Sequence, residues 1–247
     1  MTLEQFFTIH PKVAMGFSGG VDSSYLLYAA KKHGADVRPY FIKSQFQPEF
    51  ELEDAKKIAA HVDVELTILY ADALCDERVV KNDDMRCYYC KSNIFGKLKD
   101  KALEDGYTVL VDGTNASDDV TDRLGWIAIG ELSVLSPLRE CGLSKDEIRR
   151  LSKEAGLFTW DKPAYACLAT RVPTGEPYTE EKLQKIEKAE DFLFSLGFSD
   201  FRVRYSKNQA KLQFPKSQIP SLLEKKDEIL SGLSDFPEVV LDLKTRD

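Results

Sequence analysis

The sequence predicts an α/β fold: a parallel sheet flanked by helices, followed by a small C-terminal α+β domain. Over residues 1–165, short apolar runs alternate with amphipathic helical stretches, as in parallel strands joined by helical crossovers. Residues 162–177 are rich in proline, glycine and threonine, and the chain beyond them resumes helix and strand patterns. We therefore expect one domain over residues 1–165 and a second over residues 166–247.

The N-terminal part shows alternating strand and helix patterns. Strands are expected at residues 13–17, 37–42, 64–70 and 108–112, and helices at residues 21–32, 48–61 and 87–104. The first of these helices ends near Gly34, because glycine is common just past helix ends. Residues 71–86 are polar and irregular, and we expect either a mobile lid or a solvated loop there.

Further helix and strand signals follow from residue 144 to the end of the chain. Ser144 and Glu147 have the spacing of a capping box, which predicts a helix over residues 145–155 that stops at Gly156. The tail is predicted to contain helices at residues 179–196 and 220–230 and strands at residues 201–205, 210–214 and 239–243. This mixture is the basis for predicting an α+β domain.

Composition narrows the class of protein. The chain has 247 residues, a net charge of −7 and no apolar run of the ~18–20 residues that span a bilayer. The start of the chain lacks a signal-peptide pattern, so we expect a cytoplasmic protein without a membrane partner. The acidic balance disfavours a nucleic-acid partner. An odd number of cysteines, five, argues against a disulfide framework and for metal binding or catalysis.

The turn after the first predicted strand is the most informative stretch. Gly19 and Gly20 let the backbone turn sharply and approach a ligand, and the helix that follows offers unpaired N–H groups to an anion. Asp22 supplies a carboxylate suited to Mg²⁺. The turn is not a Walker loop, because no Gly-Lys-Ser/Thr follows. The expected phosphate-binding residues are Ser18, Gly19, Gly20, Val21, Asp22, Ser23 and Ser24.

Three cysteines form a second candidate site. Cys87 and Cys90 make a C-x-x-C pair at the start of a predicted helix, and Cys167 lies in the stretch between the domains. The pair alone is compatible with a redox dithiol or a zinc site, but no second ligand pair exists for zinc. If the 162–177 stretch folds back, three thiolates meet, one short of the four of a [4Fe–4S] cluster. One iron would then be free to hold a small ligand such as sulfide. The alternative is two buried structural cysteines plus an unrelated one, and Cys75 and Cys141 are expected to be bystanders.

The Ser18–Ser23 string resembles the pyrophosphate loop (PP-loop) of enzymes that split ATP into AMP and pyrophosphate. The chain as a whole is similar to the LarE family of ATP-dependent sulfur insertases. The motifs that carry this resemblance are Ser18-Gly19-Gly20-Val21-Asp22-Ser23, Tyr88-Tyr89, Val111-Asp112-Gly113, Cys167 followed by Arg171, and residues 201–205. Such proteins adenylylate the carboxylate of a pyridinium dicarboxylate mononucleotide and replace oxygen with sulfur, on the way to a nickel-pincer cofactor.

The resemblance also implies roles for single residues. ATP and Mg²⁺ would be bound by the loop residues with Asp22, and by Ser44, Gly113 and Thr114 at the strand ends. The mononucleotide would be bound by Arg171, Arg202 and Arg204, although an exposed strand face is the alternative for the last two. Asp118, Asp119 and Arg123 are further candidates in a loop that faces the site.

Two branches of the family differ in their sulfur source. In one, a single cysteine that matches Cys167 gives up its sulfur and becomes dehydroalanine; in the other, three cysteines bind a [4Fe–4S] cluster. The C-x-x-C places this chain with the second branch. At the trimer-interface metal site proposed for the first branch, the resemblance keeps an acidic residue as Glu190, whereas another acidic position is Gln213 in this chain, so the hexamer of that branch is not implied here.

The resemblance implies a small-molecule nucleotide substrate and a homo-oligomer, and the sulfur donor is not specified. Two further functions stay open: thiolation of tRNA by a PP-loop enzyme, and a nucleotide-binding regulatory module without catalysis.

Overall fold

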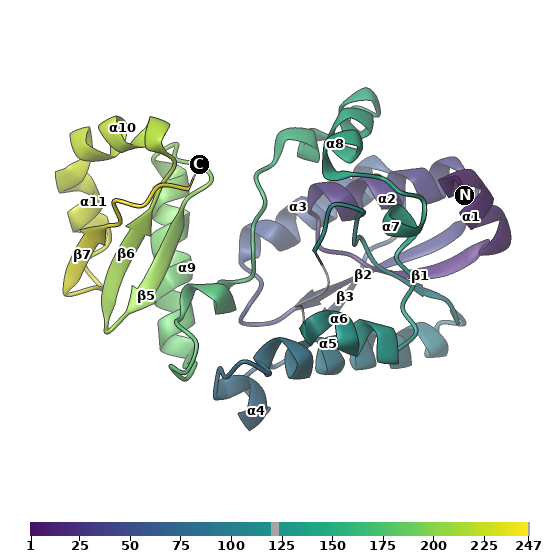
Figure 1. Ribbon diagram of the computed structural model, residues 1–247, viewed down its shortest axis with the longest axis horizontal. Coiled ribbons are helices and arrows are strands. Elements are labelled where there is room, and N and C mark those ends of the chain that lie inside the picture. Colours follow the sequence, from purple (N-terminus) through teal and green to yellow (C-terminus); the bar gives the residue numbers. More distant parts are fainter. Residues whose placement is uncertain (120–123, 247) are drawn as a thin grey trace. The chain divides into compact units, whose positions relative to one another are not determined.

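The computed structural model describes residues 1–119 and 124–246, which form two compact units (Figure 1). The first unit comprises Met1–Asp72 and Met85–Lys162, and the second comprises Ala73–Asp84 and Pro163–Asp247. The predicted domain border between residues 165 and 166 stays a prediction. Among the described residues, no helix is both long enough and apolar enough to cross a membrane.

The first unit contains a parallel sheet, which confirms the predicted α/β class. Its strand order is β3-β2-β1-β4, with β1 at Lys12–Gly16, β2 at Asp36–Lys43, β3 at Thr67–Tyr70 and β4 at Leu110–Val111. Val13 pairs with Val37 in the parallel register of β1 and β2. Val111 makes one further parallel bridge to Leu135 beyond the edge of the sheet. The carboxyl ends of β1, β2 and β4 therefore share one edge, where open α/β sheets bind ligands.

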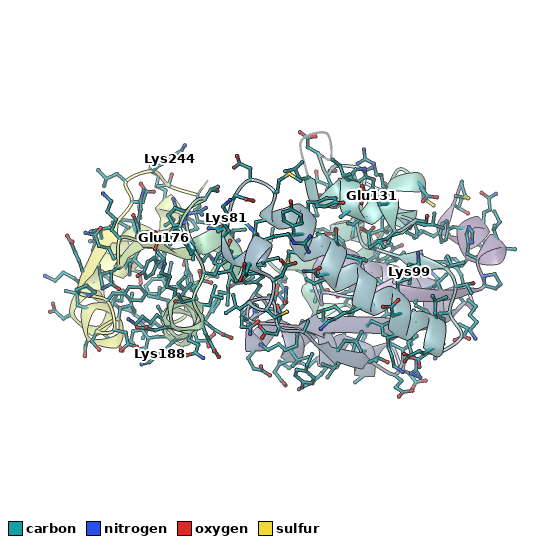
Figure 2. The ribbon with its side chains drawn as sticks, turned by 90° about the horizontal axis from the view of Figure 1, so that it is seen from below. Lys81, Lys99, Glu131, Glu176, Lys188 and Lys244 are labelled. Atoms are coloured by element: carbon teal, nitrogen blue, oxygen red, sulfur yellow. The ribbon has the colours of Figure 1, made fainter. Side chains whose placement is uncertain are left out.

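Helices cover both faces of this sheet (Figure 1). One layer contains α1 (Leu3–Ile9), α2 (Val21–Lys32), α3 (Glu49–His61), α7 (Pro137–Glu140) and α8 (Lys145–Glu154), with the 3-10 turn η1 at Phe158–Asp161. The other layer contains α5 (Arg86–Glu104) and α6 (Leu124–Glu131). A hydrogen bond joins these two helices, because the Tyr88 hydroxyl donates to Glu131 Oε2 at 2.8 Å. Lys99 and Glu131 mark these two helices in Figure 2.

Alternation along the strands produces these two apolar layers. Val13 and Met15 of β1 join the core beneath α1 and α2, whereas Ala14 between them joins the core beneath α5. All three side chains are fully buried. Successive strand residues point to opposite faces, so a strand buried on both sides reads as an unbroken apolar run. Such a run was the signal from which this strand was predicted.

The second unit is a three-stranded mixed sheet with helices, as expected for a small α+β part. The antiparallel pair is β5 (Arg202–Ser206) and β6 (Gln209–Gln213), and β7 (Glu238–Leu241) runs parallel to β6. Lys207 and Asn208 form the hairpin turn at φ of 50° and 64°. The remaining elements are α4 (Glu77–Val80), η2 (Leu168–Arg171), α9 (Glu180–Ser195), η3 (Lys216–Gln218), α10 (Ile219–Glu224) and α11 (Lys226–Gly232).

Residues 71–86 are where the predicted local structure is wrong. They contain the short helix α4 instead of forming an irregular loop, and Asp76 caps this helix by accepting from the amide of Arg78. Asn82 follows at a left-handed φ of 52° and is 1% exposed. Its side chain donates to the carbonyl oxygens of Pro173 at 2.8 Å and Glu176 at 2.9 Å. The polar residues of this stretch thus serve tertiary hydrogen bonds within the second unit.

Candidate functional site

The turn Ser18-Gly19-Gly20 joins β1 to α2, as predicted. Gly19 has a φ of +70°, and a Cβ built there would lie 2.9 Å from the backbone nitrogen of Ala55 in α3. Glycine is therefore required both by the backbone conformation and by the close approach of α3. Gly20 is the N-cap residue of α2, and in the described part of the chain no side chain caps this helix. The first amides of α2 therefore receive no side-chain cap from the N-cap residue, and helix N-termini of this kind attract anions.

Two hydroxyl groups brace the turn from inside. Ser18 Oγ lies 3.0 Å from Ser23 Oγ and accepts from the amide of Gly20 at 3.3 Å. Ser23 also donates to the carbonyl oxygen of Gly20 at 3.2 Å. Ser24 is different: it is fully buried, and its hydroxyl has no hydrogen-bond partner among the described residues. The turn thus brings Ser18 and Ser23 together, whereas Ser24 faces the core.

Asp22, in the first turn of α2, forms an ion pair with Lys145 at the start of α8. Its other oxygen accepts from Asn115 Nδ2 at 3.4 Å. Burial raises the pKa of the Asp22 carboxyl above its ordinary value, and Lys145 only partly offsets this effect. Lys145 is itself fixed, because its amide donates to Ser117 Oγ at 3.0 Å. A partly buried carboxylate and an ammonium group therefore stand beside the Ser18–Gly20 turn.

The end of β4 forms the facing wall of the site. A Cβ at Gly113 would lie 3.1 Å from the backbone nitrogen of Ser23, so this chain segment passes directly over the start of α2. Asp112, 5% exposed, accepts from the Thr114 hydroxyl and from the Ser136 hydroxyl, each at 2.7 Å. Gly113 and Thr114 thus follow the carboxyl end of β4, and Gly113 lies against the start of α2; their role in binding ATP stays a prediction.

Ser44 follows β2 at the same sheet edge. It is 6% exposed and donates to Gln47 Oε1 at 2.6 Å, while it accepts from the amide of Phe46 at 3.2 Å. Its hydroxyl is therefore engaged in a local turn. Asp118 lies near Asp22, since its charge contributes to the raised pKa of Asp22. Arg123 lies outside the described residues.

The predicted cysteines belong to two units. Cys87 and Cys90 stand in the first turn of α5 in the first unit; the former is exposed and the latter half-buried. Residues three apart share one helix face, so the two thiols are neighbours. Cys167 is the half-buried N-cap residue of η2 in the second unit. Across the described ranges, no group of three or more His, Cys, Asp or Glu side chains has the arrangement of a metal site.

The predicted arginines lie together in the second unit. Arg171 is 1% exposed, and its guanidinium forms a two-pronged pair with Glu190, with Nε to Oε1 at 2.8 Å and Nη2 to Oε2 at 3.1 Å. Arg202 is 5% exposed, so the exposed-strand alternative is wrong for this residue. Burial, with Arg171 and Arg246 nearby, lowers the pKa of Arg202 to about 10. Arg204 donates to Gln213 Oε1 at 2.5 Å, and burial lowers its pKa too.

The chain is similar to several known proteins. The family model described as "Queuosine biosynthesis protein QueC" matches residues 12–89. An uncharacterized protein of Synechocystis is 36% identical over 225 residues, covering 90% of this chain and 83% of its own. The pyridinium-3,5-bisthiocarboxylic acid mononucleotide synthase of Lactiplantibacillus plantarum is 30% identical over 236 residues, covering 94% of this chain and 86% of its own.

The chain belongs to the LarE family. A tRNA-specific 2-thiouridylase MnmA of Pseudothermotoga lettingae is also similar, with 28% identity over 220 residues, covering 73% of this chain and 62% of its own. The LarE-family chain is an ATP-using sulfurtransferase, as predicted.

Sequence reasoning missed several residues of the ATP side of the site. Lys145 was interpreted only as the first residue of a capped helix, and Asn115 and Ser136 only as loop residues. Each acts through a partner distant in sequence: Lys145 and Asn115 through Asp22, and Ser136 through Asp112. A lysine directly after the N-cap serine of a helix is unfavourable beside the helix dipole, and this was the one available signal.

Proposed function

We propose that this LarE-family enzyme uses ATP to adenylylate a carboxylate of a pyridinium dicarboxylate mononucleotide and then replaces oxygen with sulfur. The named synthase relative supports the substrate class. The observation that carries the ATP half is the PP-loop turn: a positive-φ glycine packed against α3, an uncapped α2, and Lys145 beside Asp22.

Activation solves a leaving-group problem. A carboxylate oxygen attacks the α-phosphorus of ATP, a new P–O bond forms, and the bond to pyrophosphate breaks. Sulfide sulfur then adds to the acyl carbon, and AMP leaves with the original carboxylate oxygen. The first step brings negative charges together, so the α2 amides and the Lys145 ammonium group lower its barrier by stabilising the phosphates.

A magnesium ion fits the Asp22 position in part. Mg²⁺ in nucleotide sites is usually held by one or two carboxylates and by substrate phosphates. Asp22 is one such carboxylate, and its raised pKa reflects a charge that is not fully compensated by Lys145. We therefore propose that Asp22 binds Mg²⁺ when ATP supplies the remaining ligands. The ion would neutralise phosphate charge during attack.

The arginine cluster is proposed to bind the anionic groups of the mononucleotide. Arg202 and Arg204 both have lowered pKa values from burial, and both also experience repulsion from Arg171 and Arg246. An additional phosphate or carboxylate would relieve that excess of positive charge. Arg171 is proposed with them, although its Nε and Nη2 donors are directed to Glu190.

A [4Fe–4S] cluster is proposed on Cys87, Cys90 and Cys167. Two adjacent thiols on the first turn of α5 fit two ligand positions, and Cys167 would supply the third. When bound, such a cluster supplies an iron coordination position for sulfide.

Acceptor-dependent release of pyrophosphate tests the function. With ATP, Mg²⁺ and sulfide, we expect release to require the pyridinium dicarboxylate mononucleotide and not tRNA. The MnmA similarity makes tRNA the proper competitor. Release with tRNA alone would instead support thiolation of RNA, and ATP binding without release for any acceptor would support a regulatory module.

Iron content tests the cluster separately. Anaerobically purified protein should hold iron and acid-labile sulfide, and Cys87→Ala should lose both. Cys141→Ala is the matched control, since Cys141 is a half-buried thiol that follows α7. An iron-free active enzyme in which Cys167 turns into dehydroalanine would instead support sacrificial sulfur donation.

Location and assembly complete the proposal. ATP and accessible thiols are typical of the reducing cytoplasm, where we place the enzyme. The homo-oligomer is proposed from family membership, and light scattering of the purified chain tests it.

A further inference from the structure

One buried carboxylate joins four parts of the second unit. Glu190, on α9, is 1% exposed, and both of its oxygens accept hydrogen bonds. Oε1 accepts from Arg171 Nε at 2.8 Å and from the amide of Val203 in β5 at 2.9 Å. Oε2 accepts from Arg171 Nη2 at 3.1 Å and from the hydroxyl of Tyr165. Glu190 therefore ties α9 to β5, to η2 and to the segment before η2.

Two of the residues that donate to Glu190 flank Cys167 in the sequence. Tyr165 comes two residues before Cys167, and Arg171 comes four residues after it. From its bond to Glu190, Arg171 reaches back with Nη1 to the carbonyl oxygen of Ala166 at 2.8 Å and to that of Cys167 at 3.5 Å. The backbone on the N-terminal side of the Cys167 sulfur is thus held by the same guanidinium that the carboxylate fixes.

Two more arginines donate hydrogen bonds to backbone carbonyl oxygens of the same loop. Arg204 Nη1 donates to the carbonyl oxygen of Thr170 at 2.6 Å, and Arg202 Nη2 donates to that of Ala164. The Tyr165 ring has the Arg171 guanidinium 4.5 Å and the Arg202 guanidinium 5.1 Å from its centroid. Leu168 and Ala169, directly after the cysteine, are fully buried. Cys167 is therefore a half-buried residue of a loop that hydrogen bonds hold on both sides.

Such an arrangement is costly to build for stability alone. Burying an ion pair costs solvation free energy that the attraction between the charges seldom fully recovers. Well-packed apolar residues in the same place often stabilise the fold equally well. Apolar residues cannot provide directional contacts. Here four hydrogen bonds to the two oxygens of Glu190 fix the positions of the donor groups. The contacts here act on the backbone carbonyls at residues 166 and 167, next to the sulfur.

We propose that Glu190 is a positioning residue for Cys167, which acts through Arg171 and Tyr165 to hold the cysteine loop in one conformation. This inference rests on the proposed role of Cys167 in sulfur transfer. It assigns Glu190 a function inside one chain, because both carboxylate oxygens are filled by donors of the second unit itself.

Glu190→Gln tests the proposal in the full chain, because it keeps the side-chain shape and removes the charge. Lys188→Gln is the matched control: it breaks an ion pair of the same helix, with Asp235 at 2.7 Å, but at a site 69% exposed (Figure 2). We expect amide exchange of residues 166–172 to accelerate about tenfold or more in Glu190→Gln, as for the loss of a charged hydrogen bond. Lys188→Gln should exchange like the wild type.

A second readout concerns catalysis. In Glu190→Gln the rate of sulfur transfer should fall while the KM for ATP stays unchanged, since the ATP turn lies in the other unit. Glu190→Asp should recover less than the wild-type rate, because its shorter side chain keeps the charge but not the reach. Tyr165→Phe, which removes a single hydroxyl donor, should accelerate exchange in the same segment by a smaller factor and serves if Glu190→Gln does not fold.

Three outcomes would overturn the inference. The first is unchanged exchange of residues 166–172 in both Glu190→Gln and Tyr165→Phe, and the second is faster exchange with an unchanged rate of transfer. The third is an equal loss in Lys188→Gln. Failure of the proposed function looks different: wild-type protein would form no thiocarboxylate while the exchange pattern of the loop still followed Glu190.

Discussion

Gly19 shows how a single residue sets the geometry of the Ser18–Gly20 turn, which we propose binds ATP. Its φ of +70° lies where a Cβ collides with the backbone, and α3 closes over the same position through Ala55. The chain offers an internal comparison in Gly34, which has a φ of +77°. A Cβ at Gly34 would meet no atom of the described chain within 4 Å beyond its immediate neighbours. Alanine substitutions at the two glycines therefore separate the free-energy cost of a positive φ from the cost of the close contact with α3.

Gly19→Ala should lower the free energy of unfolding by about 2 kcal/mol or more, because both costs apply. It should also abolish ATP binding, because the turn must open to admit the methyl group. Gly34→Ala should cost about 1 kcal/mol and leave ATP affinity unchanged. Urea denaturation and calorimetric titration with ATP check both. Equal ATP affinity in the two variants would contradict the assignment of the turn.

Asp22 makes stability depend on pH in the sense opposite to most carboxylates. Its folded pKa is raised above the ordinary 3.8, chiefly by burial. Between 3.8 and the folded pKa, the folded chain holds more protons than the unfolded chain, so stability falls as the pH rises. Above the folded pKa, the full free-energy cost of the buried Asp22 charge lowers stability. The protein without ATP therefore bears this cost at neutral pH.

Asp22→Asn should therefore stabilise the protein without ATP at pH 7, and this gain should vanish as the pH falls below 3.8. The same variant should lose Mg²⁺-dependent pyrophosphate release. Asp63→Asn is the control: its carboxylate is 99% exposed, and stability should change by no more than about 0.5 kcal/mol. Thermal melts over a pH series measure both; destabilisation by Asp22→Asn at pH 7 would contradict the sign.

At this scale, sequence predicts residues whose role depends on local geometry. Gly19, Gly20 and Ser18 could be predicted because a glycine turn before a helix is local. The pairing of Lys145 with Asp22 could not, because it depends on the packing of α8 against α2. Arg171 was predicted to bind substrate, which stays untested, and its partner Glu190 is nineteen residues away on another helix.

Among the elements, the segment of α4 shows how polar residues can build tertiary structure. Asn82 fills three roles at once: its left-handed backbone ends the segment after α4, its amide donates to two carbonyls, and its Oδ1 accepts from Tyr178 at 2.5 Å. The same Tyr178 hydroxyl also lies 3.0 Å from the carbonyl oxygen of Ala169 in η2, so its one proton is shared between two acceptors. The segment is thereby fixed to the cysteine loop of its own unit.

Asn82→Ala should destabilise the second unit by about 2–3 kcal/mol, because buried carbonyls and a tyrosine hydroxyl lose their partners. Protease cleavage within residues 73–84 should increase. Lys81→Ala, at a neighbouring side chain that is 74% exposed (Figure 2), is the matched control and should change little. Equal protease resistance of both variants would contradict this function of Asn82.

Element predictions succeeded where periodicity was strong and failed where contacts decide. Helix α9 differs from its prediction by one residue at each end, because Thr179 caps it locally. The single helix expected over residues 220–230 is instead α10 and α11, which meet at Lys225. Helix α1 was missed, although Thr2 and Gln5 form a capping box, since its seven residues are too few to show a period.

At the scale of the whole molecule, the chain crosses between its two compact units three times, near residues 72, 84 and 162. The second crossing lies just before Cys87, and the third just before Cys167. The proposed cluster ligands therefore follow directly on inter-unit connections. Sequence could predict the fold class and the turn between β1 and α2, because both follow from local sequence patterns. It could not predict that residues 73–84 join the second unit.

The most direct test of the central claim is the mass of the product formed from ATP, sulfide and the pyridinium dicarboxylate mononucleotide, measured with the AMP released. We predict a thiocarboxylate, in which one oxygen is replaced by sulfur, formed in equal amount to AMP and absent with Gly19→Ala. AMP released in quantity with the mononucleotide returned unchanged, or thiocarboxylate formed without ATP cleavage, would contradict the account.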